Sequence, residues 1–386
     1  MITTVAVSGY RSLRDVVVPL HGLDLVTGAN GSGKSSLYRA LRLLAGCARG
    51  EVAGALAREG GIQSALWAGP ETLVAARERG AAVEGLRRTG PVALRLGFAT
   101  DDGFGYLVDL GLPIPVPGGS AFDRDPEIKR EIVFSGPVPR PNAVLVERKG
   151  ALVRMRDGRE WSELSRALQP WESMLTELAD PDRAPELLAV RDTVRGWRFY
   201  DGFRVDADAP ARRTQIGTRT PVLGADGADL AAALQTIREI GDPDALDGTV
   251  ADAFAGATID VTSDGGRFDL ALRQPGMLRP LASAELSDGT LRYLLLVAAL
   301  LTPRPPALMV LNEPETSLHP ELLPPLARLV ARVAERSQVV VVSHSRVLLG
   351  ALGPDAQGLE LEKDLGETRI TGQGRFERPP WHWGSR

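Results

Sequence analysis

A chain of 386 residues, 44% of them hydrophobic, is long enough to form two lobes or one core with a large insertion. Its formal net charge of -4 excludes a surface covered throughout by the clustered Lys and Arg that phosphate binding needs, although a local basic patch remains compatible. The single cysteine, Cys47, excludes a disulfide framework or a cysteine zinc site within one chain, and it fits a reducing, cytoplasmic location.

No feature predicts a membrane segment. The first residues lack a basic stretch followed by an apolar run, so we expect no signal peptide. The most apolar run, Leu291 to Leu301, contains Arg292 and is far shorter than the ~20 apolar residues that cross a bilayer. We therefore expect a soluble protein with no membrane partner.

The chain opens with three short strand-like runs, around residues 5–7, 16–20 and 23–27. A glycine-rich loop follows, and then apolar residues at helical spacing over Lys34 to Ala45. The pattern predicts three strands, a loop and a helix.

The middle of the chain mixes both kinds of element. We expect strands at 92–98, 106–110, 132–134 and 143–146, and helices broken by prolines over Trp161 to Arg195. A further helix is predicted over Leu230 to Ile240. Two runs, 259–261 and 268–272, flank Asp264-Gly265-Gly266 and predict a hairpin.

The last third alternates helix and strand, as a parallel sheet does. The predicted elements are a helix at 287–301, a strand at 307–311, a helix at 321–335, a strand at 339–342, and a tail hairpin of 359–361 with 368–371. The predicted fold is therefore α/β. We divide it into an N-terminal part with the glycine-rich loop (1–50), an inserted α+β lobe that partly completes the sheet (51–280), and a C-terminal part (281–386).

The glycine-rich loop matches the pattern G-x-x-x-x-G-K-[ST] between a strand and a helix, which is the context that a phosphate loop requires. It reads Gly28, Ala29, Asn30, Gly31, Ser32, Gly33, Lys34 and Ser35. Glycines allow successive N–H groups to surround a phosphate chain, and the helix start adds a positive dipole end. Lys34 is expected to reach the β- and γ-phosphates of ATP, and the Ser35 hydroxyl to bind Mg²⁺.

A second polar cluster follows the strand at 307–311. Glu313 at its tip is placed to accept a proton from an attacking water, so it is the candidate catalytic base. Asn312 stands where an acid usually holds Mg²⁺, and its amide can hold the ion through water.

Two other polar segments lie at the ends of predicted elements, one before a helix and one after a strand. Ser287, before Asp288-Gly289, is either a helix N-cap or part of an anion site at a helix start. His344 follows the β-branched strand, beside the tip that carries Glu313, and is the candidate sensor of the γ-phosphate.

Together these motifs resemble the ATP-binding-cassette (ABC-type) P-loop ATPases of the RecF, SMC and OLD group, and more closely the small bacterial AAA family ATPases. The resemblance rests on Gly9-Tyr10-Arg11-Ser12-Leu13, Gly28 to Ser36, Leu286 to Thr290, Leu311 to Pro320 and Ser343-His344-Ser345, in the family's order. It covers both ends of the chain and little of residues 50–280.

The resemblance implies an α/β head with a mixed sheet split by an insertion, and two heads that sandwich two ATP molecules as a homodimer. It implies that Ser287, Asp288 and Gly289 of one copy act on the nucleotide held by Lys34 of the other. Ser36, Arg11 and Ser12 then join the nucleotide-binding residues. Glu313 and His344 are catalytic together with Lys34, and the loop at 316–319 crosses the dimer interface.

The sequence departs from the family pattern in three places. Asn312 replaces an aspartate, so hydrolysis can be slow. Only Gln63 is a candidate for the glutamine loop. About forty residues follow His344, too few for the toprim nuclease of the OLD group, and no coupling helix for a membrane domain is recognisable.

The leading hypothesis is an ATP-gated dimeric switch in DNA repair, chromosome maintenance or phage defence, acting on DNA or on a partner protein. A nucleotide-dependent regulatory module with little turnover is the alternative. A small-molecule kinase is disfavoured, because kinases have no use for the Ser287 segment. Four aromatic residues are expected to pack in the core more than to stack on bases: Trp171, Trp197, Phe199 and Tyr200.

Overall fold

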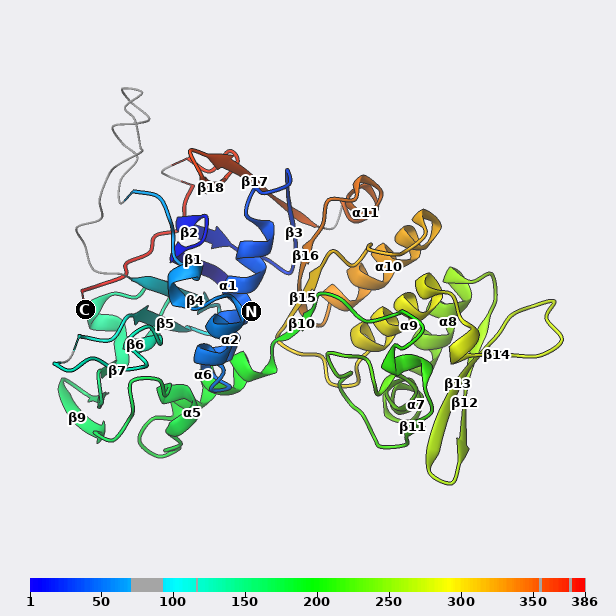
Figure 1. Ribbon diagram of the computed structural model, residues 1–386, viewed down its shortest axis with the longest axis horizontal. Helices are drawn as coiled ribbons and strands as arrows, with labels where there is room; N and C mark the ends of the chain where they lie inside the picture. Colours follow the sequence, from blue (N-terminus) through cyan, green and yellow to red (C-terminus); the bar gives the residue numbers. More distant parts are fainter. Residues whose placement is uncertain (71–92, 116, 354–355, 375–376, 386) are drawn as a thin grey trace. The chain divides into compact units, whose positions relative to one another are not determined.

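A computed structural model describes residues 1–70, 93–115, 117–353, 356–374 and 377–385 (Figure 1). The chain forms two compact units. Unit 1 comprises residues 1–21, 27–197 and 359–386, and unit 2 comprises residues 22–26 and 198–358. The phosphate loop belongs to unit 1, whereas most of the strand that leads into it belongs to unit 2.

Unit 1 is built on an eight-stranded antiparallel sheet in the order β2-β1-β4-β5-β6-β7-β8-β9. Its strands are β1 (Ile2–Tyr10), β2 (Leu13–Pro19), β4 (Leu94–Thr100), β5 (Phe104–Gly111), β6 (Glu127–Ser135), β7 (Val144–Lys149), β8 (Leu152–Asp157) and β9 (Glu160–Ser165). The four middle strands expected from the sequence are present. β5, β6 and β7 are longer than predicted, whereas β4 extends to Thr100 instead of ending at residue 98. Val92, the first residue of that predicted strand, lies outside the described residues. The expectation of a helix at Trp161 was wrong: Trp161 lies in β9, paired with Arg156 of β8.

Five helices are described in unit 1, together with a short 3-10 turn and the C-terminal hairpin. They are α1 (Lys34–Cys47), α2 (Val52–Arg58), α3 (Ile62–Ala65), α5 (Met174–Glu177), α6 (Pro185–Gly196), η1 (Pro141–Ala143), and the strands β17 (Gln357–Asp364) and β18 (Glu367–Ile370). Helix α1 packs on β1 and β4, and α6 on β5 and β6. The predicted tail hairpin is confirmed, with Leu361 opposite Ile370.

Unit 2 is built on a parallel sheet, as the alternation of helix and strand predicted. Its strands follow the order β10-β15-β16-β3, with bounds β10 (Arg198–Tyr200), β15 (Leu308–Asn312), β16 (Gln338–Val342) and β3 (Leu23–Gly28). Asn312 lies opposite Val342, and Val342 lies opposite Val26. The carboxyl ends of these three strands therefore share one edge of the sheet.

The remaining elements of unit 2 are five helices, three 3-10 turns and a small antiparallel sheet. They are α7 (Leu230–Ile240), α8 (Pro243–Ala253), α9 (Asp288–Leu300), α10 (Leu323–Ala334), α11 (Arg346–Leu352), η2 (Pro210–Arg212), η3 (Ser283–Glu285), η4 (Pro320–Leu322), β11 (Gln215–Ile216), β12 (Thr258–Asp264), β13 (Arg267–Arg273) and β14 (Leu281–Ala282). The predicted hairpin is β12 with β13.

Helix α9 is the centre of the unit 2 core. Ten of its thirteen residues are buried, and it packs against α7, α8 and α10. A helix that is apolar on all sides must be enclosed by other elements, which explains why its sequence resembles a short membrane segment. Across the described residues, no helix combines the length and the apolar character needed to span a membrane.

The aromatic residues behave largely as expected. Trp197 and Tyr200 are buried, and Trp197 meets the Phe98 ring edge-on at 5.1 Å. Trp171 differs, because 61% of its surface is exposed.

A buried ion pair ties the unit 1 sheet to the segment after β9. The Arg148 Nη1 atom lies 2.8 Å from the Glu131 Oε2 atom, and neither side chain is exposed. Glu131 also accepts hydrogen bonds from the hydroxyls of Tyr106 and Ser173, while Arg148 donates to the carbonyl oxygen of Gln169. Full hydrogen bonding is what makes a buried charge pair tolerable.

We expect Glu131→Ala to lower the free energy of unfolding of unit 1 by about 3–5 kcal/mol, because it leaves the Arg148 charge buried and uncompensated. Glu163→Ala, which removes the exposed pair of Glu163 with Arg166, should cost less than about 1 kcal/mol. All six tryptophans lie in unit 1, so urea unfolding followed by tryptophan fluorescence reports on this unit. Equal losses in the two variants would contradict the assigned role.

Candidate functional site

The phosphate loop is held open by three glycines with positive φ. Their φ angles are 139° at Gly28, 80° at Gly31 and 113° at Gly33, values that other residues rarely adopt. Gly33 caps α1, and no side chain caps that helix end. The first N–H groups of α1 are therefore available to an anion, as phosphate binding requires.

The polar side chains of the loop are arranged around this helix start. The Lys34 ammonium donates to the carbonyl oxygens of Gly28 and Ala29, at 2.6 and 3.0 Å, and is buried. Ser35 is exposed and Ser36 is partly exposed, while Ala29 and Asn30 form the exposed tip of the loop. The Ser32 hydroxyl is buried and makes no hydrogen bond to any described residue.

The C-terminal hairpin braces this loop, a contact that the sequence analysis missed. The Thr368 hydroxyl oxygen is 2.7 Å from both the Ser12 hydroxyl oxygen and the Ser32 carbonyl oxygen. A Cβ atom at Gly33 would lie 2.1 Å from that hydroxyl. Two residues of the hairpin thus shape the loop from far along the chain. Thr368 lies 356 positions after Ser12. A Cβ at Gly28 would lie 2.2 Å from the Leu361 carbonyl oxygen.

Arg11, expected to approach the nucleotide, is held by an acid in unit 1. Its Nε and Nη2 atoms donate to Glu59 Oε2 at 3.0 and 2.7 Å. The Tyr10 hydroxyl donates to the same carboxylate, and burial with this carboxylate nearby raises the pKa of Tyr10. Ser12, the neighbour of Arg11, contacts the loop through Thr368. Gln63 is exposed on α3.

In unit 2, the end of β15 carries two acceptor oxygens that lack partners. The Asn312 Oδ1 and Glu315 Oε2 atoms are buried, and neither accepts a hydrogen bond from a described residue. Such oxygens suit a Mg²⁺-bound water, so Asn312 fits the metal role expected from the sequence. Among the described residues, no group of three or more His, Cys, Asp or Glu side chains is arranged to hold a metal ion alone.

Glu313 and His344 lie beside each other, as the sequence predicted for neighbouring strand ends. The His344 Nδ1 atom is 3.9 Å from Glu313 Oε1 and 3.6 Å from Glu315 Oε1. Glu313 has a φ of 50°, and its N–H donates to the Val342 carbonyl oxygen at 2.8 Å. The positive φ and this hydrogen bond fix the backbone of Glu313, and they therefore fix the direction in which its side chain leaves the backbone.

Glu315 organises the turn that carries His344, and sequence reasoning assigned it no role. It is buried, and its Oε1 atom accepts from the Ser343 hydroxyl at 2.6 Å and from the His344 and Ser345 N–H groups at 3.1 and 3.3 Å. The sequence does show an acidic residue two positions after Glu313, but this spacing does not reveal which way the Glu315 side chain points.

Of the two interpretations of the Ser287 segment, the structure confirms the helix N-cap. Ser287 is the N-cap of α9, and its hydroxyl accepts from the Thr290 N–H at 3.1 Å. Ser287 and Asp288 are nevertheless exposed, and Gly289 lies so close to the loop after β15 that an added Cβ would be 3.1 Å from the Ser317 carbonyl oxygen. The cap and an anion site are compatible at one helix start.

Arg212 holds the Ser287 segment in place, and the sequence analysis assigned it no role. Its guanidinium, 8% exposed, donates to the carbonyl oxygens of Val205 and Leu286 at 2.8 and 2.7 Å, and to Asp288 Oδ1 at 2.7 Å. A guanidinium with this many acceptors is rigid. Arg212 is therefore a positioning residue for the α9 start.

Comparison with known proteins decides the family. A family model described as "AAA domain, putative AbiEii toxin, Type IV TA system" matches residues 25–350, most of the chain. The chain belongs to this AAA family. The expected resemblance to P-loop ATPases of the AAA and SMC kind is thereby confirmed.

Solved structures agree on the fold. An SMC head bound to the C-terminal winged-helix domain of ScpA aligns with TM-score 0.51 and 14% identity, covering 96% of both chains. An SMC head with an extended coiled coil, bound to the C-terminal domain of ScpA derived from Pyrococcus furiosus, gives TM-score 0.52 and 12% identity, covering 96% of this chain and 95% of that one. No curated protein sequence matches the chain. The fold is thus the α/β, ABC-type head that the sequence predicted.

We expect Thr368→Val to weaken ATP binding by about tenfold, since the Ser32 carbonyl loses its partner and such a loss costs ~1–3 kcal/mol. The affinity is measured by isothermal titration calorimetry. Thr371→Val, an exposed threonine beside the same hairpin, should leave the affinity unchanged. Unaltered binding in Thr368→Val would show that the hairpin does not shape the loop.

Proposed function

We propose that this chain binds and hydrolyses ATP as an ATP-gated homodimer. One observation carries the proposal: the strand β3 that leads into the phosphate loop is hydrogen-bonded to β16, and β16 to β15, in one parallel sheet. The loop therefore follows, within two residues of Val26, an edge that also bears Asn312, Glu313 and His344. Ligands of parallel α/β sheets bind at the carboxyl ends of the strands.

The roles follow from chemistry. The residues from Gly28 to Ser36 bind the phosphates, and Lys34 neutralises the charge that develops on the transferred phosphoryl group. Glu313 accepts the proton of the attacking water, and His344 senses the γ-phosphate from the next strand end. Mg²⁺, when bound, supplies further neutralisation, and Ser35 and Asn312 are the residues assigned to hold it.

The second copy completes each site in this proposal. Ser287 and Gly289, with Asp288, contact the nucleotide bound by the partner's phosphate loop, and the loop at 316–319 crosses the interface. Ser287 and Asp288 are exposed, so the start of α9 is accessible to a second copy, as this assignment requires. Residues 1–50 and 281–386 act as the ATPase head, with residues 51–280 as its insertion.

Asn312 supports the alternative, a regulatory module with weak hydrolysis. An amide brings no charge to the metal, so it binds Mg²⁺ less strongly than a carboxylate. Asn312→Asp separates the two functions: it should leave turnover similar if the chain is an ATPase, and raise it from background if the chain is a regulator.

The proposed pathway rests on the family description and on the proteins whose structures align with this chain. The family description names a toxin of a toxin–antitoxin system, which favours phage defence over DNA repair or chromosome maintenance. The aligned SMC heads bind ScpA, so a partner protein is a reasonable effector. Cys47 is a buried free thiol, consistent with the proposed cytoplasmic location.

We expect Glu313→Gln to lose about 10²–10⁴-fold in ATP turnover while it keeps ATP affinity, because the base is removed and the loop is intact. The variant should also accumulate as an ATP-bound dimer. Phosphate release and light scattering measure both effects, with and without DNA, and Lys34→Ala is the non-binding control. A Glu313→Gln protein that turns over ATP normally would remove Glu313 from the mechanism.

Ser287→Asp tests the second copy without disturbing the helix. Aspartate is as good an N-cap as serine, so stability should be unchanged, whereas its charge repels a γ-phosphate. We expect ATP-dependent dimerisation and turnover to be lost. Mixing Ser287→Asp with Lys34→Ala should restore part of the turnover, since each mixed dimer then has one intact composite site. If the mixture stays inactive while both variants fold, the sites are not shared between copies.

A further inference from the structure

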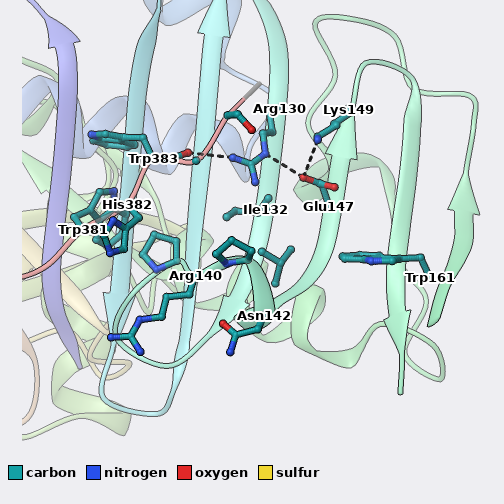
Figure 2. Close-up of a pocket in the computed structure, with 15 residues that line it drawn as sticks. Arg130, Ile132, Arg140, Asn142, Glu147, Lys149, Trp161, Trp381, His382 and Trp383 are labelled. Carbon is teal, nitrogen blue, oxygen red and sulfur yellow. Dashed lines mark hydrogen bonds and ion pairs between the residues drawn. The ribbon is translucent and has the colours of Figure 1, made fainter. Parts of the chain in front are cut away.

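A pocket of about 780 Å³ lies on unit 1 and uses none of the residues assigned to ATP (Figure 2). Strands β6 and β7, Trp161 of β9 and the C-terminal segment around Trp381 and Trp383 enclose it. Its volume is in the range of small-ligand sites, ~300–1,000 Å³, and is too small for a double helix.

The pocket occupies the face of the eight-stranded sheet that α1 and α6 leave uncovered. Side chains alternate between the two faces of a strand. Phe98 points toward Trp197, directly after α6, so its neighbour Ala99 points the other way. Ala99 shares a cluster with Ile132 and Phe134, and Trp161, Trp381 and Trp383 pack against that cluster.

The C-terminal segment forms an aromatic wall. The Trp381 ring meets Phe134 at 5.9 Å and Trp383 at 5.7 Å, both edge-to-face. The Trp383 carbonyl oxygen accepts from Arg130 Nη1 at 3.0 Å, and its indole N–H donates to Asp15. Trp381 fits because Gly97 lacks a Cβ, which would otherwise lie 2.5 Å from its ring. The wall is thus fixed before any ligand binds.

One polar group in this wall lacks a partner. The Trp381 Nε1 atom is buried and donates to no described residue. A buried N–H without an acceptor costs ~1–3 kcal/mol. It is therefore a ready donor for an acceptor atom of a ligand.

Positive charge exceeds negative charge around the pocket. Its lining contains three cationic side chains and one carboxylate, Arg130, Arg140 and Lys149 with Glu147. The Glu147 carboxylate already pairs with Arg130 at 3.1 Å, with Lys149 at 3.5 Å and with Arg154 at 3.2 Å. One acid shared among three cations leaves a net positive patch, although the whole chain has a net charge of -4.

Trp161 adds a stacking surface on the β9 side. The guanidinium carbons of Arg154 and Arg156 each lie 5.3 Å from the Trp161 ring centre. Indole rings and guanidinium planes are among the surfaces on which proteins stack unpaired bases. Cations beside them bind the phosphate that follows each base.

We propose that this pocket binds a nucleobase together with its phosphate, either as part of a single nucleic acid strand or as a free nucleotide. An apolar ligand would leave the surplus of cations unpaired, and an acidic peptide would leave the three indoles without a stacking partner. The inference does not depend on the proposed ATPase function, because the two sites share no residue.

The test uses the full chain carrying Lys34→Ala, so that the phosphate loop does not contribute. A fluorescein-labelled ten-nucleotide oligo-dT is titrated by fluorescence anisotropy, and dTMP and AMP compete for it. We expect binding that Trp161→Ala weakens by about 5–150-fold, the effect of losing one stacked base, ~1–3 kcal/mol. Trp171→Ala, an exposed tryptophan outside this pocket, is the matched control and should bind as before.

A second variant tests the charge. Lys149→Gln should weaken binding and reduce the slope of log affinity against log salt by about 1, the mark of one lost phosphate contact. Its side chain is 48% exposed, so the fold is preserved. Competition by micromolar dTMP or AMP would identify a free nucleotide as the ligand, and competition by unlabelled oligonucleotide alone would identify a single strand.

Three results would overturn the proposal. They are the absence of binding by both oligo-dT and mononucleotides, an affinity that Trp161→Ala leaves unchanged, and equal displacement by poly-glutamate, which would show charge attraction without base recognition. Glu313→Gln turnover assays remain interpretable in each case, because ATP hydrolysis is measured separately.

Discussion

The parallel pairing of β3, β16 and β15 is the constraint on which the functional arrangement depends. In-register pairing places Asn312, Val342 and Val26 in one row across the sheet. Each strand then continues into a polar segment at this edge of the sheet: Ala29 to Ser36 after β3, Glu313 after β15 and His344 after β16. A shift of this register by one residue would turn the strand-end side chains to the other face of the sheet.

Long-range polar contacts turn these strand ends and loops into defined geometry. Thr368 reaches Ser12 and Ser32 to brace the phosphate loop, Glu315 gathers the turn that carries His344, and Arg212 fixes the start of α9. In each case a buried or nearly buried polar group binds main-chain atoms of a loop. Loops have no ladder of their own to hold them, so side-chain hydrogen bonds determine their shape.

The two faces of the unit 1 sheet serve different ends. One face packs against α1 and α6 and contains the fully hydrogen-bonded pair of Glu131 and Arg148. The other face is covered in part by Trp381 and Trp383 and carries surplus positive charge. A single sheet thus supports the helix that follows the phosphate loop and, on its opposite side, presents a binding surface independent of it.

Local signals in the sequence determined much of this protein. The glycines and Lys34 of the phosphate loop, the apolar strand before Asn312, the β-branched run before Ser343 and the helix over Leu230–Ile240 could all be predicted, because turn chemistry and periodicity act over a few neighbouring residues. The tertiary structure alone decided that Trp161 lies in a strand, that Glu315 and Arg212 point at main-chain atoms, and that Thr368 meets Ser32. These features arise from contacts between residues far apart in the chain. Such contacts cannot be predicted from neighbouring residues, because the stabilising partner is not among them.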